Sequence, residues 1–140
     1  MYTIGYQHYS LETFLKVLDN HSITKLVDVR SVPYSVRKEF ARPSLKSVLG
    51  DRYVWKRELG GKAYPHKHEG YDEAIQWLRD LAVTDNVCIM CMESDAQKCH
   101  REFWIAQDLR AHDINVVHLG NGAHVQKRVD KSLDLWTDKK

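Results

Sequence analysis

The sequence predicts one α/β domain over residues 1–140, a three-layer Rossmann-like fold in which helices flank a mostly parallel sheet. Strand-like and helix-like segments alternate along the chain, which implies right-handed crossovers between parallel strands. The most apolar segment, residues 86–92, is typical of a central strand that is covered on both faces. No repeat, low-complexity segment or linker divides the chain, and its length suits a single domain.

The first part of the chain predicts a strand, a helix and a second strand. Residues 2–6 form a short apolar run that includes a glycine. Ser10 is a suitable N-cap, because its side chain can accept a hydrogen bond from a free backbone N–H. The apolar residues after it fall on one face of a helix, and they are Leu11, Phe14, Leu15 and Leu18. Residues 25–30 predict the second strand.

The middle of the chain contains less regular elements. Residues 31–42 are an irregular basic stretch, and a short helix over 44–49 is expected to end at Gly50. Residues 52–55 predict a brief strand, and residues 58–61 a turn.

The second half predicts two further strand–helix units. An amphipathic helix is marked by Ala74, Ile75, Trp77, Leu78, Leu81 and Ala82. The central strand over 86–92 is followed by a helix over 99–111 and a last strand over 115–119, which ends at a turn over 120–122. A final helix is predicted from the spacing of Val125, Val129, Leu133 and Trp136.

Composition excludes several classes of protein. The chain is 43% hydrophobic and 29% charged, as is ordinary for globular domains, and it lacks an apolar run of the ~20 residues that span a membrane. The N-terminus lacks the pattern of a signal peptide. Three cysteines cannot all pair, which favours a reducing compartment, so we expect a cytoplasmic protein. A net charge of +2 is too small for bulk attraction to nucleic acid, so any such binding requires a local patch.

The strongest candidate site lies between the central strand and the helix that follows it. Ligands of parallel sheets collect beyond the carboxyl ends of the strands, where Cys91 and Glu93 are expected. Cys99, His100 and Arg101 then begin the helix, whose positive end would lower the pKa of Cys99. Arg101 can bind a carboxylate or phosphate through two hydrogen bonds. We therefore interpret the thiols, Glu93 and His100 as candidate catalytic groups and Arg101 as a substrate-binding group.

Asp28 and Arg30 form a second candidate pair at the same edge. A charged side chain within an apolar strand is costly unless it is paired, and these two lie on one face of the strand. They could pair with each other. Alternatively, Asp28 holds Arg101 or His100, as a further catalytic candidate, while Arg30 binds an anionic ligand.

Four other residues are candidate substrate-binding positions. Tyr6 and Ser31 follow strands at the same predicted edge. Gly60 and Gly61 permit backbone conformations closed to other residues, which suits either a tight turn or close approach to a ligand.

The eight histidines raise the question of a metal. No His-x3-His pair is present, and a zinc site built from Cys91, Cys99 and His100 would need a fourth ligand of unknown identity. We therefore expect neither a metal nor another cofactor.

Several sequence blocks resemble the domain-of-unknown-function family numbered 488. The blocks are residues 3–6 (TIGY), 26–33 (LVDVRSVP), 58–61 (ELGG), 90–93 (MCME) and 99–101 (CHR). The resemblance implies a small Rossmann-like domain with a shared cysteine-containing site, and no established reaction. A weaker likeness to rhodanese and cysteine-phosphatase domains would place their nucleophile at Cys91. The segment from Cys91 to Arg101 is longer than the phosphatase loop and carries two acidic residues.

Three functional hypotheses follow. The first is an enzyme, a hydrolase or transferase, that acts on an anionic small molecule derived from a nucleotide or nucleic acid. Its nucleophile would be Cys91 or Cys99, unless Glu93 or Asp28 acts as a catalytic carboxylate. The second is a sulfur-transfer or redox enzyme that uses both cysteines. The third is a non-catalytic module that binds nucleic acid through residues 34–42, where Arg37, Lys38 and Arg42 alternate with aromatic side chains.

Overall fold

The computed structural model describes residues 1–61 and 66–120, and it confirms the predicted α/β class. Five strands form one sheet in the order β3-β2-β4-β1-β5, and every pair is parallel. The strands are β1 (Tyr2–Gly5), β2 (Lys25–Asp28), β3 (Tyr53–Trp55), β4 (Val87–Cys91) and β5 (Val117–Leu119). The α-helices are α1 (Leu11–Asn20), α2 (Arg42–Leu49), α3 (Tyr71–Thr84) and α4 (Gln107–Ala111). Single 3-10 turns cover Lys38–Phe40, Gly50–Arg52, Arg57–Leu59 and Ala96–Lys98.

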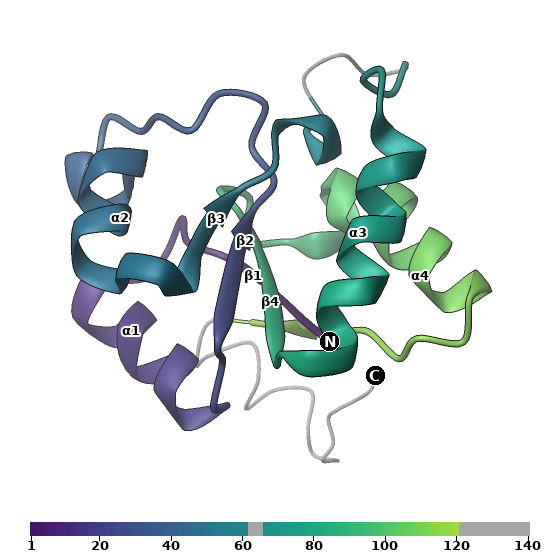
Figure 1. The fold of residues 1–140 in the computed structure, drawn as a ribbon. Coiled ribbons are helices and arrows are strands. Elements are labelled where there is room, and N and C mark those ends of the chain that lie inside the picture. Colours follow the sequence, from purple (N-terminus) through teal and green to yellow (C-terminus); the bar gives the residue numbers. More distant parts are fainter. Residues whose placement is uncertain (62–65, 121–140) are drawn as a thin grey trace.

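The sheet is the middle of three layers, with α1 and α2 on one face and α3 and α4 on the other (Figure 1). The strand order explains this division. The chain first moves outward from β1 to β2 and β3, and then returns through β4 to β5. Because crossovers between parallel strands are right-handed, a reversal of direction places the later helices on the opposite face.

Local sequence signals account for the ends of the early helices. Ser10 caps α1, since its Oγ accepts a hydrogen bond from the Thr13 N–H at 3.1 Å. Helix α2 begins at Arg42, earlier than predicted, because Pro43 lies in the first turn, where no N–H is required. Gly50 ends α2 with a φ of 58°, a left-handed conformation that favours glycine.

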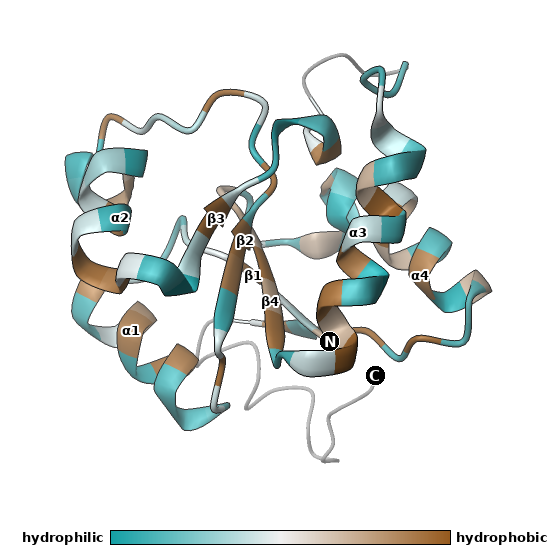
Figure 2. Cartoon of the chain, viewed as in Figure 1, coloured by the Kyte–Doolittle hydropathy of each residue, from teal (hydrophilic) through white to brown (hydrophobic). Residues whose placement is uncertain are grey.

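Each face of the sheet buries its own apolar cluster. The ribbon of the central strand β4 is hydrophobic along its length (Figure 2). Strand side chains alternate between the two faces, as the period of two requires. The α1/α2 side contains Ile4, Tyr6, Phe14, Leu18, Leu26, Phe40, Leu45, Cys88 and Met90. The α3/α4 side contains Val27, Val29, Leu59, Leu78, Ile89, Cys91, Cys99, Ile105 and Leu109.

Strands β1 and β4 form the switch point of the sheet. They are neighbours, but the chain leaves them toward opposite faces, which is where open α/β sheets bind ligands. Gly5 ends β1 beside Cys91, the last residue of β4. A Cβ on Gly5 would lie 1.9 Å from the carbonyl oxygen of Glu93, so only glycine lets the turn after β4 close over β1.

The helix predicted over 99–111 has an unusual beginning. Residues Arg101–Ala106 form wider π-helical turns before α4 starts at Gln107. The helix predicted from Val125 to Trp136 lies outside the described residues. Among the described helices, none has the length and apolar character needed to cross a bilayer.

Candidate thiol site

Cys91 and Cys99 meet beneath the switch point of the sheet. Their Sγ atoms are 2.9 Å apart, and both are free thiols. Cys91 ends the central strand, while Cys99 follows the 3-10 turn that leads into the π-helical segment. Their side chains are only 4% and 6% exposed. The fold therefore brings together two thiols that are eight residues apart in sequence.

His100 lies against the Cys99 sulfur with its orientation fixed by the backbone. Its Nε2 is 3.1 Å from the Val29 carbonyl oxygen, and its Nδ1 is 3.5 Å from Cys99 Sγ. A carbonyl oxygen only accepts hydrogen bonds, so Nε2 must carry a proton. In the neutral ring Nδ1 is then a base that faces the thiol.

Arg101 places a buried positive charge near the two sulfurs. It is 0% exposed, and its guanidinium donates to Thr3 Oγ1 at 2.9 Å and to the Glu93 carbonyl oxygen at 2.5 Å. Its Nε has no hydrogen-bond partner among the described residues. No described carboxylate forms an ion pair with Arg101, and a buried charge without a counter-charge is costly. A thiolate at the site would supply that counter-charge.

The surroundings give the two thiols opposite tendencies to ionise. The hydrogen bond from Cys91 holds the pKa of Cys99 well below its ordinary value, and His100 and Arg101 act in the same direction. Burial raises the pKa of Cys91, as does its hydrogen bond to Cys99. Burial opposes the charge of Arg101, but the neighbouring Cys91 and Cys99 raise its pKa above the ordinary value. The site thus favours one thiolate, at Cys99, beside one protonated thiol.

A pocket of about 280 Å³ opens onto Cys99 and His100. The other residues that line it are Ser31, Gly61, Glu93, Lys98 and Phe103. Cys91 is not among the lining residues, so it lies behind Cys99 as seen from the pocket.

Two glycines of the predicted turn form part of the packing around this pocket. A Cβ on Gly61 would lie 2.8 Å from ring atoms of His100, and one on Gly60 would lie 2.7 Å from the backbone of Ser31. Both therefore allow close approach of two chain segments. Ser31 Oγ also lies 2.9 Å from His68 Nε2, which links the segment after β2 to the residues before α3.

The two acidic side chains between the cysteines shape the turn. The Glu93 carboxylate accepts from the Asp95 N–H at 3.0 Å, and the Asp95 carboxylate accepts from the Gln97 N–H, also at 3.0 Å. The Glu93 carbonyl oxygen receives Arg101, as described above. Glu93 therefore contacts Arg101 through its main chain, whereas its carboxylate binds within the turn.

Asp28 and Arg30 lie on the opposite, α1/α2, side of the sheet. The Asp28 oxygens accept from Arg30 Nε at 2.8 Å, from Arg30 Nη2 at 2.6 Å and from the Tyr53 hydroxyl at 2.5 Å. Of the two alternatives weighed for this pair, the structure shows the one in which they bind each other. Asp28 does not contact His100 or Arg101. Its carboxylate instead forms an ion pair with the Arg30 guanidinium.

Tyr6 and the basic stretch belong to this same side. Tyr6 is buried and stacks on Phe40 with ring centroids 4.5 Å apart. Arg37 donates to the carbonyl oxygens of Tyr6, at 3.3 Å, and of Tyr9. Arg42 lies over the Trp55 ring at 4.9 Å. Two cations and one aromatic ring of the proposed nucleic-acid patch thus have partners within the fold, whereas Tyr34 and Lys38 remain exposed.

Three residues near the thiol site were not predicted from the sequence to belong to it, and they are Thr3, Glu102 and His118. The parallel register places Thr3 beside His118, and their Oγ1 and Nδ1 atoms are 2.6 Å apart. His118 Nε2 lies 2.7 Å from the Glu102 carboxylate. A signal for this contact exists in the sequence, since Thr3 is a polar residue within an apolar strand, but its partner depends on strand order.

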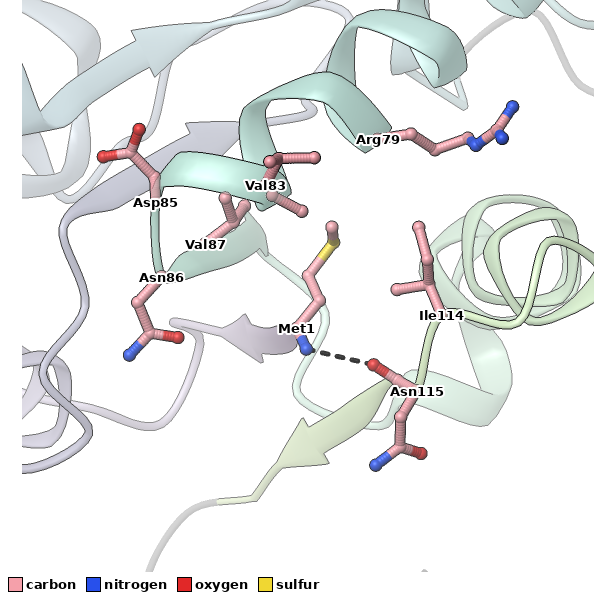
Figure 3. A pocket seen from close by; sticks show the side chains of 9 residues that line it. Met1, Arg79, Val83, Asp85, Asn86, Val87, Ile114 and Asn115 are labelled. Atoms are coloured by element: carbon pink, nitrogen blue, oxygen red, sulfur yellow. Dashed lines mark hydrogen bonds between the residues drawn. The ribbon is translucent and has the colours of Figure 1, made fainter.

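A second pocket, of about 350 Å³, lies near the start of β4, lined by Met1, Arg79 and Asp85 among others (Figure 3). Among the described residues, no three His, Cys, Asp or Glu side chains are grouped so as to hold a metal ion.

Comparison with known proteins finds a family that is similar to the first half of the chain. The model of a family described as "Domain of unknown function DUF488" matches residues 10–73. This range contains Asp28, Arg30 and the Gly60–Gly61 turn, and it ends before Cys91. No curated protein and no solved structure matches the chain. Over residues 10–73 the chain is therefore similar to the DUF488 family, in agreement with the resemblance noted in its sequence.

Proposed function

We propose that this domain catalyses thiol–disulfide exchange, with Cys99 as the attacking thiol and Cys91 as the resolving thiol. The observation that carries the proposal is the 2.9 Å separation of the two sulfurs, of which only Cys99 lines the pocket. Reactive cysteines are found in electropositive surroundings at accessible positions, and Arg101 and His100 supply those surroundings here.

In the first step the Cys99 thiolate attacks a substrate disulfide that occupies the pocket. A new bond forms between Cys99 and one substrate sulfur while the substrate S–S bond breaks. The displaced thiolate takes the proton that His100 received from the Cys99 thiol. Nδ1 of His100 is placed for this transfer, at 3.5 Å from the sulfur.

In the second step Cys91 attacks the mixed disulfide at the Cys99 sulfur. The second substrate thiol leaves with the Cys91 proton, and a Cys91–Cys99 disulfide remains. The substrate disulfide has gained two electrons and two protons, which the protein's two thiols have lost. An external thiol returns the protein to its reduced form by the reverse sequence.

The structure gives less support to an enzyme that captures an anion through Arg30 and Arg101. Arg30 is paired with Asp28 on the opposite side of the sheet, and Arg101 is fully buried. Lys98 is the cation that lines the pocket, so a negatively charged group beside the substrate disulfide is compatible with this proposal.

A direct test uses the anionic disulfide dithiobis(nitrobenzoate) with the reduced, folded chain. The wild-type protein should release two equivalents of thionitrobenzoate and retain none, because Cys91 displaces the second. Cys91→Ser should release one and retain one on Cys99, as seen by intact mass. Cys99→Ser should react slowly.

Cys88→Ser is the matched control, because Cys88 is a buried thiol on the α1/α2 side. It should behave as the wild type does. Wild-type protein that retains the probe on Cys99, with no linkage between Cys91 and Cys99 in a peptide map, would refute the exchange mechanism. A stable Cys99 persulfide after treatment with thiosulfate, with Cys91 dispensable, would point to sulfur transfer instead.

A further inference from the structure

We propose that Thr3 and His118 are positioning residues, which hold the Arg101 guanidinium against the thiol pair through a hydrogen-bonded chain anchored at Glu102. This inference rests on the proposed function, because it assigns Arg101 the task of stabilising the attacking thiolate. None of the three residues, Thr3, Glu102 and His118, lines the pocket.

The direction of each hydrogen bond in the chain follows from chemistry. Arg101 only donates, so Thr3 Oγ1 accepts from its Nη1 at 2.9 Å. The Glu102 carboxylate only accepts, so His118 Nε2 donates to it at 2.7 Å. The neutral His118 ring then has Nδ1 free to accept from the Thr3 hydroxyl at 2.6 Å. Each of these three hydrogen bonds therefore joins a donor to an acceptor.

The outer end of the chain is fixed. Both Glu102 oxygens accept from Arg110 Nη1, at 2.9 and 3.0 Å, and Arg110 also donates to the Val116 carbonyl oxygen at 3.3 Å. The charged groups that act on His118 are Glu102, Arg101 and Arg110. Burial lowers the pKa of His118, and Arg101 lowers it further, although Glu102 opposes both. The neutral ring that the chain requires is therefore the favoured form near neutral pH.

The inner end of the chain explains why Arg101 needs such support. Its guanidinium is fully buried and has two hydrogen-bond acceptors, Thr3 Oγ1 and the Glu93 carbonyl oxygen. Because no described carboxylate pairs with it, these two bonds set its orientation toward the sulfurs. Loss of the Thr3 hydroxyl would leave one bond, about which the planar group can turn away.

The test compares Thr3→Val, which removes the hydroxyl at nearly constant shape, with Thr3→Ser, which keeps it. The readout is the pKa of Cys99 in the reduced, folded chain, taken from the pH dependence of alkylation by iodoacetamide at that residue. Thr3→Val should raise this pKa by at least one unit, and so reduce the thiolate about tenfold at a pH below the pKa. Thr3→Ser should restore the wild-type profile.

Glu102→Gln serves as a second variant, because it alters the partly exposed end of the chain and keeps a side chain of the same shape. It should shift the Cys99 profile in the same direction by a smaller amount. A wild-type pKa near that of an ordinary thiol would refute the proposed function itself. If the wild-type pKa of Cys99 is low and stays unchanged in folded Thr3→Val, only the positioning role is refuted. If Thr3→Val does not fold, an unchanged pKa in Glu102→Gln refutes that role instead.

Discussion

His100 Nε2 donates to the Val29 carbonyl oxygen at 3.1 Å, and this bond turns Nδ1 of the same ring toward Cys99. Val29 directly follows β2, and its main-chain carbonyl group thus orients the candidate base, although its side chain is not reactive. The roles of the two ring nitrogens can therefore be tested separately by mutation.

His100→Gln should retain a donor to Val29, through its amide, and lose the base at Nδ1. We expect alkylation of Cys99 near neutral pH to slow at least about tenfold, because less of the thiol is ionised. Iodoacetamide rates measured across pH check this, and His112→Gln, at an exposed position, is the control. Wild-type rates in folded His100→Gln would show that the ring does not promote ionisation.

Cys88 should be protected from reagents in the folded chain. It is 0% exposed, and burial raises its pKa to about 12. Mass spectrometry of the native protein after brief alkylation should find label on Cys99 and none on Cys88, whereas denaturant should expose all three thiols. Early labelling of Cys88 would contradict the packing on the α1/α2 side.

Gly61→Ala should disturb the site, because its Cβ would lie 2.8 Å from the His100 ring. We expect a loss of roughly 1–3 kcal/mol in the free energy of unfolding, as in other overpacked sites. The displaced ring should also slow Cys99 alkylation. Gly50→Ala is a useful contrast, since its φ of 58° strains an alanine but its Cβ would meet nothing within 4 Å. It should reduce stability without changing the alkylation rate.

Asp28→Asn should destabilise the fold without altering thiol reactivity. The change leaves Arg30 buried without its counter-charge, which costs about 3–5 kcal/mol in comparable buried pairs. Urea unfolding measures the loss. Since the pair lies on the α1/α2 side, the Cys99 alkylation profile of the folded variant should match the wild type, and a shifted profile would contradict this separation.

Acid should weaken the fold through His118. Its pKa is lowered in the folded chain, so the unfolded chain binds a proton more readily there, and stability rises with pH in that range. The contribution is fully present above about pH 6.5, the ordinary value for histidine, and is lost as pH falls through the folded value. Unfolding curves across pH should show a smaller loss on acidification for His118→Asn than for the wild type. An equal loss in both would assign the effect to other groups.

The sequence predicted the elements better than the contacts between them. Apolar spacing identified α1, α3 and the central strand, because these patterns depend on local geometry. The period of two also placed Asp28 and Arg30 on one face of their strand. Which face this is, relative to Cys91, depends on the direction of the later crossovers, and no local pattern contains that information.

The candidate site shows the same division. Cys91, Cys99, His100 and Arg101 could be proposed because they surround one strand–helix junction. The Thr3–His118 contact requires that β1 and β5 be neighbours in a particular register, and residues 115 positions apart give no sign of it. Likewise, the basic stretch gave no indication that Phe40 is buried or that Arg37 is committed to backbone carbonyl groups.

The π-helical turns over Arg101–Ala106 have a mechanical consequence for a chain that alternates between dithiol and disulfide. Joining the sulfurs covalently requires one of them to travel, and Cys91 is secured in β4 between two neighbouring strands. Cys99, just before the π-helical turns, is therefore the residue that we expect to move. A π-helical turn contains more residues than an α-helical turn, so a local change in winding can accommodate the shift of Cys99. The oxidised and reduced forms should thus differ chiefly in residues 96–106, while the sheet stays rigid.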